Sequence, residues 1–307
     1  MTDSFFGTES VKVVKLQDWM QWSSGQAGVA RRVVLPMIQR GSVWPPHKLL
    51  DLWDTLLRGM PVGALMASES LPESPVIGLG EAEAHQSKSG DIDLIDGQQR
   101  TLSMLAGWPD GLKNPTRPVS VWLGLDDTPP QGEYRFRLWA ATKTQPFGYA
   151  RASMGGQPLG KLERVKLRLA NQAWEGKDAQ TLWKLPDFMP WEAKFALPLT
   201  DLIANKLIAN KGGLQALLVE RLTTYKQALN NKIEGLKAEE GLKAEVEQCK
   251  DALVKGPSQY FAKKLDSLPK EDELVKYAPV IEKALENVLN YQFPIIHVWR
   301  ENFEDKR

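Results

Sequence analysis

The stretch "DLIDGQQRTLSML", residues 93–105, carries the most informative local pattern in the chain. A short apolar run ends at Asp96 and Gly97, two glutamines and an arginine follow, and apolar residues then recur at helical spacing. This order predicts a strand, a tight junction and a helix. Asp96 would then lie at the carboxyl end of the strand, where α/β folds place their ligands.

The polar residues of this junction are typical of an anion site. Four of them fall in or near the first turn of the expected helix: Gln98, Gln99, Arg100 and Thr101. The free N–H groups and the dipole of a helix N-terminus favour phosphate, and Gly97 lets the backbone approach a ligand. Arg100 can hold phosphate oxygens bidentately, the glutamines can bond a base, a ribose or a phosphate, and Asp96 can hold Mg²⁺ or a water. The alternative is an Asp-Gly type I′ turn with Arg100 in a surface ion pair.

A second Gln-Arg pair follows another expected strand. The run "VVLPMI" (33–38) predicts a strand, "QRGSVW" (39–44) follows it, and residues 45–57 show helical spacing. Gln39 and Arg40 would therefore lie at a strand end, and Trp44 would either stack on a base or pack in the core. Two strand–Gln-Arg–helix junctions in one domain can converge on one anion.

The rest of the chain predicts an α+β protein with a boundary near residue 155. Further strands are expected at 62–67, 91–95, 119–125 and 134–142, with a hairpin or exposed loop at 68–90. Glycine and proline concentrate at 144–160, and mainly helical patterns follow, including a long charged helical arm. We therefore expect domains at 1–155 and 156–307. The strand "FPIIHVW" (293–299) must add to a sheet formed earlier or lead into further sequence, so a missing carboxyl-terminal part is expected.

Composition excludes several classes of protein. The chain has 307 residues and a net charge of +1, so any DNA contact must be a local patch. The single cysteine, Cys249, excludes a disulfide framework and a cysteine-based zinc site. The three histidines are too scattered for a zinc or HNH nuclease centre: His47, His85 and His297. Walker-type and G-x-S-x-G motifs are absent, no apolar run matches a membrane span, and no signal peptide is evident. A cytoplasmic protein is expected.

The ordered motifs resemble a known family. "LPMIQRGSVW", "LLDLWDTLLRGMPVGALM" and "LIDGQQRTLSML" are similar to the amino-terminal domain of GmrSD-like restriction proteins. This is the domain-of-unknown-function family 262, which includes SspE-type sensors of phosphorothioated DNA. The resemblance spans roughly residues 10–150. It implies a ParB/sulfiredoxin-like mixed α/β fold, followed here by a mainly helical region with a long arm and a terminal strand.

The resemblance also implies site residues. The Asp-Gly-Gln-Gln-Arg motif of the family is associated with nucleotide binding and hydrolysis, which implies a phosphate site formed by Asp96, Gly97, Gln98, Gln99 and Arg100. Gln39, Arg40 and Trp44 match a Gln-Arg-x-x-x-Trp motif implicated in the same pocket or in sensing the DNA modification. Asp96 and Arg100 are the expected catalytic residues, and Asp96 is the expected Mg²⁺ ligand.

The function implied is that of an NTP-binding and NTP-hydrolysing sensor in a bacterial anti-phage, modification-dependent restriction system. The nucleotide would be GTP, ATP or another triphosphate, used with Mg²⁺. Expected partners are modified DNA, an HNH nuclease at the carboxyl terminus or on a separate chain, and further copies of the protein, with no membrane. The alternatives are a non-catalytic ParB-like reader of modified DNA and an adaptor domain for a separate nuclease.

Two features depart from the family pattern. Ile38 stands where many members have an aromatic residue before the first Gln-Arg pair. The Asn/Gly-rich motif and the HNH nuclease that often follow the "FPIIHVW"-like strand are absent. We therefore expect that this chain does not cut DNA by an HNH mechanism.

Overall fold

The structure is a computed structural model, and contacts between Cα atoms divide the chain into two compact units. One unit comprises Met1–Val121, Leu199–Ala204 and Glu282–Arg307, and the other comprises Trp122–Pro198 and Asn205–Ile281. The structure describes residues 4–25, 28–29, 31–37, 44–81, 83–112, 118–125, 136–150, 157–160, 178–185, 188–207, 213–246 and 257–299. Each unit is described by itself.

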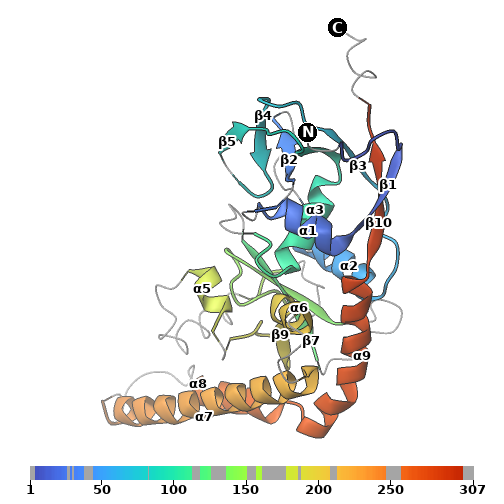
Figure 1. Cartoon of the computed structure of the whole chain (residues 1–307). Helices are drawn as coiled ribbons and strands as arrows, with labels where there is room; N and C mark the ends of the chain where they lie inside the picture. The colour runs from blue at the N-terminus through green and yellow to red at the C-terminus, as the bar shows by residue number, and fades with distance from the viewer. Residues whose placement is uncertain are drawn as a thin grey trace. The chain divides into compact units, whose positions relative to one another are not determined.

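The first unit is built on a seven-stranded mixed sheet (Figure 1). In spatial order the strands are β1 (Val11–Lys15), β10 (Gln292–His297), β3 (Leu65–Glu69), β6 (Ile92–Asp96), β2 (Val33–Pro36), β4 (Pro75–Gly78) and β5 (Ala84–Gln86). The β10–β3 and β2–β6 pairs are parallel, and the other pairs are antiparallel. Strands β4 and β5 form the hairpin expected within 68–90.

Strand β10, the last strand that the structure describes, lies inside this sheet. β10 pairs antiparallel with β1 through Val11↔Ile296 and parallel with β3 through Ile295↔Leu65. The expectation that the strand near residue 293 adds to a sheet formed earlier is therefore confirmed. Apolar side chains alternate between the two faces of β10, which explains why this segment is a strand of the sheet. Phe293 and Ile295 are buried, whereas Ile296 is 37% exposed.

Three helices pack beside the sheet: α1 (Leu16–Ser23), α2 (Pro46–Leu57) and α3 (Gln98–Gly107). Helix α2 begins with proline at its first position and buries Trp53 completely. The indole N–H of Trp53 donates to the Ser103 carbonyl at 2.8 Å, which joins α2 to α3. A Cβ atom on Gly107 would lie 2.5 Å from the Trp53 ring, so this glycine permits the close approach of the two helices. The helix expected at 45–57 is confirmed.

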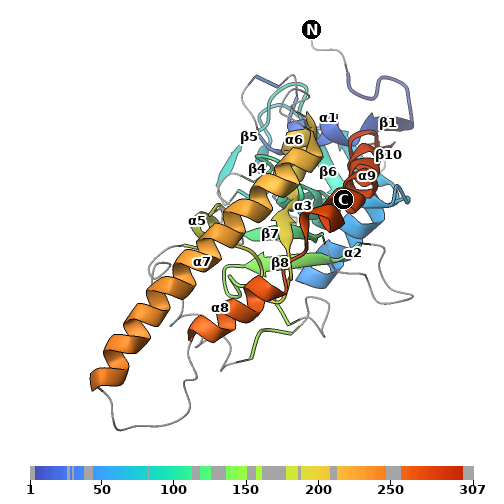
Figure 2. The same cartoon turned by 90° about the horizontal axis from the view of Figure 1, so that it is seen from below.

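The second unit combines a small sheet with helices. Its strands are ordered β8 (Leu138–Thr142), β7 (Val119–Gly124) and β9 (Ala196–Pro198), and β7 enters from the first unit. Its helices are α5 (Ala179–Trp183), α7 (Leu214–Val246) and α8 (Pro257–Asp266). Helices α7 and α8 lie side by side (Figure 2), and α8 begins at Pro257, where the expected helical arm was predicted to end. Residues 161–174, expected to be helical, lie outside the described residues.

Two further helices contain residues of both units: α6 (Leu199–Leu207) and α9 (Glu271–Leu289). The contact-based division therefore differs from a single boundary near residue 155. Strand β7 pairs with β9 from Trp122 onward, and the chain returns to the first unit at Glu282. The α+β class is confirmed, whereas the ParB/sulfiredoxin-like topology stays an expectation.

Candidate functional site

The junction between β6 and α3 depends on one glycine. Gly97 is the N-cap of α3 and has a φ of 104°, in the left-handed region that residues with a Cβ atom rarely adopt. A Cβ atom there would lie 2.2 Å from Cδ2 of Leu65. The Thr101 N–H donates to the Gly97 carbonyl at 2.9 Å, so the helix starts directly after the strand. A two-residue hairpin turn at Asp-Gly is therefore excluded.

Arg100 joins the end of β6 to the loop between α2 and β3. Its Nη1 atom donates to the carbonyls of Val62 at 3.2 Å and Ala64 at 2.7 Å. Its Nη2 atom donates to Oδ2 of Asp96 at 2.8 Å. The Arg100 side chain is 19% exposed, whereas that of Asp96 is 63% exposed. The guanidinium group thus holds the local backbone on one side and a solvent-accessible carboxylate on the other.

Tyr291 holds the same loop from the opposite end of the chain. Its hydroxyl accepts a hydrogen bond from the Val62 N–H at 2.8 Å and donates one to the Met60 carbonyl at 2.9 Å. Burial raises the pKa of Tyr291 above its ordinary value of 10.0, so the phenol keeps the proton that it donates. Between these contacts, Gly63 has a φ of 83°, and a Cβ atom there would lie 3.2 Å from Nη1 of Arg100. The loop is therefore fitted to the guanidinium group.

A hydrogen bond links the two Gln-Arg-containing motifs. The backbone N–H of Trp44 donates to Oε1 of Gln99 at 3.2 Å, and the Trp44 side chain is half-buried. The last residue of the Gln-Arg-x-x-x-Trp motif therefore lies beside the first turn of α3. Gln39 and Arg40 lie outside the described residues.

The remaining two polar residues of the first turn differ in exposure. Gln98 is half-buried, whereas Thr101 is fully buried and its hydroxyl accepts the indole N–H of Trp19 at 3.2 Å. The Thr101 N–H is also occupied by the Gly97 carbonyl. In this conformation Thr101 joins α1 to α3 and presents no surface to a ligand.

Asp96 is suited to only one mode of Mg²⁺ binding. Within the described ranges, no group of three or more His, Cys, Asp and Glu side chains is arranged to hold a metal. Magnesium is commonly bound by one or two carboxylates together with substrate phosphates rather than by a cage of protein ligands. The exposed Asp96 carboxylate fits that shared mode.

The sequence did not indicate the groups that surround Arg100. Its acceptors are the Val62 and Ala64 main-chain carbonyls, and main-chain atoms leave no residue-specific signal. A strand was expected at 62–67, whereas β3 begins at Leu65 and Val62 and Ala64 lie in the loop before it. Tyr291 lies 229 positions from Val62, and nothing local to either residue predicts their contact.

Comparisons with known proteins identify the domain. Residues 23–142 match the model of the GmrSD restriction endonuclease, N-terminal domain. An uncharacterized protein of Methanocaldococcus jannaschii is 30% identical over 106 residues, which cover 31% of this chain and only 18% of that relative. No solved structure matches the chain. Among the helices that the structure describes, none is sufficiently long and apolar to cross a membrane. Residues 23–142, which contain both Gln-Arg motifs, are a GmrSD-like N-terminal domain.

Proposed function

We propose that this protein is an NTP-binding and NTP-hydrolysing sensor module of a modification-dependent, anti-phage DNA restriction system. The GmrSD-like domain implies a component of a restriction system and suggests interaction with DNA. The observation that carries the nucleotide assignment is the hydrogen bond between Trp44 and Gln99, which brings Trp44, the last residue of the second motif, to the first turn of α3. Charge and hydrogen-bond donors from both motifs then act on one ligand.

The nucleotide phosphates would bind at the N-terminus of α3. The first N–H groups of a helix lack intrahelical acceptors and carry a positive partial charge, which favours phosphate. Nη2 of Arg100 already faces a carboxylate, so a phosphate oxygen can take the position of Asp96 Oδ2. Nη1 would meanwhile keep the loop carbonyls of Val62 and Ala64 in place. Arg40 of the second motif would add a second cation.

Asp96 would position either the metal or the attacking water. Mg²⁺, when bound, supplies neutralisation of the phosphate charge. The 63% exposure of Asp96 gives its carboxylate access to both. Displacement of Arg100 from Asp96 by phosphate would also release the carboxylate for this role, which couples nucleotide binding to catalysis.

One observation favours a non-catalytic alternative. Arg100 already makes three hydrogen bonds within the protein, and such bonds can be its whole role. In that case the domain would be a ParB-like reader of modified DNA, or an adaptor for a separate nuclease, and the nucleotide would be a switch or absent.

The test is hydrolysis of a panel of nucleoside triphosphates by the full chain, with and without modified duplex DNA. Arg100→Ala and Asp96→Asn are compared with Arg58→Ala, because Arg58 also pairs with an aspartate four positions away, at 3.1 Å, outside the site. We expect hydrolysis to fall about a hundredfold or more in the first two variants and to persist in the third.

Three outcomes separate the candidates. Hydrolysis that survives both Arg100→Ala and Asp96→Asn contradicts the catalytic assignment. Nucleotide binding without hydrolysis, or no nucleotide-induced thermal shift, favours the reader. If neither modified nor plain duplexes bind at low salt, the reader assignment fails as well.

A further inference from the structure

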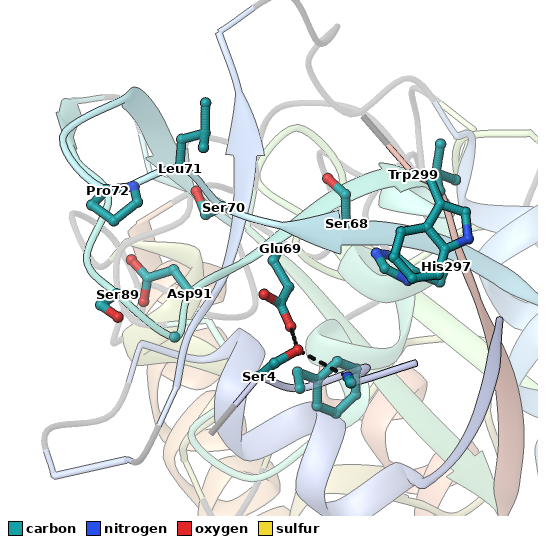
Figure 3. Close-up of a pocket in the computed structure, with 14 residues that line it drawn as sticks. Ser4, Ser68, Glu69, Ser70, Leu71, Pro72, Ser89, Asp91, His297 and Trp299 are labelled. Carbon is teal, nitrogen blue, oxygen red and sulfur yellow. Dashed lines mark hydrogen bonds between the residues drawn. The ribbon is translucent and has the colours of Figure 1, made fainter. Parts of the chain in front are cut away.

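A cavity lies at the end of β3 and β6 opposite the Gly97 junction. Met66 is paired with Asp96 at one end of these strands, and Glu69 is paired with Ile92 at the other. Four residue steps along β6 correspond to roughly 13 Å. The cavity has a volume of about 450 Å³, within the range of small-molecule sites. Residues of the N-terminal segment, β3, the turn before β6 and the end of β10 line it (Figure 3).

Glu69 is the carboxylate at the centre of the lining (Figure 3). Its Oε1 atom accepts hydrogen bonds from the Ser4 hydroxyl and from the Phe6 N–H, the latter at 3.3 Å. Partial burial raises the pKa of Glu69, but hydrogen bonds from Ser4, Phe6 and Phe5 and the charge of His297 outweigh it and hold the pKa below 4.5. A carboxylate has about four lone-pair positions, so Glu69 keeps capacity for a further donor.

Asp91, the second carboxylate of the lining, is held within the protein. It accepts from Nε of Arg32 at 3.1 Å, from Nη2 of the same residue, and from the Lys88 N–H at 2.8 Å. Its side chain is only 4% exposed. Glu69 is therefore the carboxylate better placed to receive a hydrogen bond from a ligand.

Aromatic rings form one wall of the cavity. The His297 ring is stacked on Phe6 with a centroid distance of 4.1 Å and an interplanar angle of 1°. Trp299 lies 4.0 Å from His297 on centroids and is 41% exposed. Within the described part of the chain, Nδ1 of His297 is a buried atom without a hydrogen-bond partner. The wall thus offers an exposed indole surface beside an ionised carboxylate.

The carboxylates, hydroxyls and indole of the lining together restrict the kind of ligand that the cavity can bind. Two carboxylates in the lining disfavour an anion inside the cavity, and the hydroxyls of Ser4 and Ser68 disfavour a purely apolar molecule. A flat ring that carries an amino group can stack on the indole of Trp299 and donate to Glu69. Stacking on aromatic side chains and hydrogen bonds from an amino group to a carboxylate are the means by which proteins hold single nucleobases.

We propose that this cavity binds an amino-bearing nucleobase, with Trp299 as the stacking surface and Glu69 as the acceptor of the amino group. The base comes either from a free nucleoside or nucleotide, or from DNA in which it has left the base stack. The site is separate from the phosphate site proposed at Arg100, because the cavity and the Gly97 junction lie at opposite ends of β3 and β6.

The first experiment measures binding of phosphate-free nucleosides to the full chain by titration calorimetry. Cytidine, adenosine and guanosine carry exocyclic amino groups, whereas uridine has none. We expect saturable binding of one or more of the first three and at least about tenfold weaker binding of uridine. No saturable binding at millimolar concentration, or equal binding of uridine, overturns the proposal.

Two variants test the named contacts. Trp299→Ala removes the stacking surface and is expected to weaken nucleoside binding by about tenfold to a hundredfold, and Glu69→Gln by about tenfold. Tyr277→Ala, at an aromatic residue that is 38% exposed in α9, is the control for the first. Glu73→Gln, an exposed glutamate outside the lining, controls for the loss of charge. Binding unchanged in both Trp299→Ala and Glu69→Gln contradicts the assignment.

A competition experiment identifies the source of the base. If a fluorescent DNA duplex is displaced by nucleosides, and Trp299→Ala weakens its binding, the base comes from DNA. If nucleosides bind and the duplex does not compete with them, the ligand is a free nucleoside or nucleotide. Arg100→Ala should leave nucleoside binding unchanged, so failure at the phosphate site is distinguishable from failure here.

Discussion

The two ends of the β3–β6 strand pair differ in how they use polar groups. At the Gly97 end, Arg100 is bonded to Asp96 and to the main-chain carbonyls of Val62 and Ala64 in the loop before β3. At the other end, Glu69 and Trp299 border a cavity of about 450 Å³. The Gly97 end carries the Asp-Gly-Gln-Gln-Arg motif, and the other end carries this cavity.

The cavity lined by Glu69 and Trp299 is therefore separate from the Asp-Gly-Gln-Gln-Arg motif. The Gly97 junction does not line the cavity, and its polar side chains serve local structure in this conformation. A ligand at the Gly97 junction must displace hydrogen bonds that Arg100 already makes. A ligand in the cavity can donate to Glu69 without displacing the bonds from Ser4 and Phe6.

Gly97→Ala should be the most destabilising of these changes. A Cβ atom would meet Leu65 at 2.2 Å, and the residue would keep a φ of 104°. Together, strain and overpacking should cost about 2–4 kcal/mol of the free energy of unfolding, measured by urea denaturation. Gly235→Ala is the control, because Gly235 lies in helix α7 with nothing within 4 Å of its Cβ position. That change should stabilise the protein by about 0.5–1 kcal/mol. Equal effects at the two glycines would contradict the steric argument.

Asp91→Asn should be the next in size. Its carboxylate is 4% exposed and bonded to both Arg32 and the Lys88 N–H, so loss of its charge weakens three hydrogen bonds. Arg32 is 26% exposed, which limits the loss to about 2 kcal/mol. Denaturation curves of this variant and the unchanged protein provide the measurement. An unfolding free energy equal, within error, to that of the unchanged protein would mean that Asp91 does not stabilise the cavity end of β3 and β6.

Asp96→Asn should cost less than about 1 kcal/mol of stability, since its carboxylate is 63% exposed and water replaces the lost interaction. Asp91→Asn and Asp96→Asn are the same substitution at opposite ends of one strand and serve as mutual controls. If Asp96→Asn is the more damaging change, the Gly97 end is the more tightly organised one. Urea midpoints of the two variants, measured together, decide between these results.

Glu69→Gln should have a small effect that depends on pH. Because the pKa of Glu69 is lowered in the folded protein, its charge contributes stability that is present above its ordinary value of 4.5. That contribution is lost as the pH falls through the lowered pKa. The difference in unfolding free energy between the unchanged protein and Glu69→Gln should therefore be larger at neutral pH than in acid. A difference independent of pH would contradict the role of the charge.

Much of the first unit was predictable from local patterns. Hydrophobic spacing predicts β2, α2, β6 and α3. Gly59 and Pro61 mark the end of α2, and Gly97 marks the junction of β6 and α3. Strand β3 starts at Leu65 rather than near residue 62, because the backbone of Val62 and Ala64 bonds to Arg100 and Tyr291 instead of a neighbouring strand. Strand β1 and helix α1 were not predicted. No turn residue separates Lys15 from Leu16, and the helix has no side-chain cap.

The cavity could not be predicted in this way. Residues that line it come from segments far apart in the chain, and none belongs to either Gln-Arg motif, among them Ser4, Glu69, Asp91, His297 and Trp299. His297 lies in β10, and its ring is stacked on Phe6. Only the pairing of β10 with β3 brings it near Glu69, and pairing partners are set by tertiary structure.

The position of β10 also has a consequence for how the protein is made. This strand is synthesised after every other strand of its sheet, yet it lies between β1 and β3. While the ribosome is still producing the intervening helices, β1 has no neighbour in the sheet and β3 exposes an unpaired edge. Non-local pairing of this kind slows folding. The nascent domain must therefore wait for residues 292–297, and a fragment that ends near residue 155 would lack an interior strand of its own sheet.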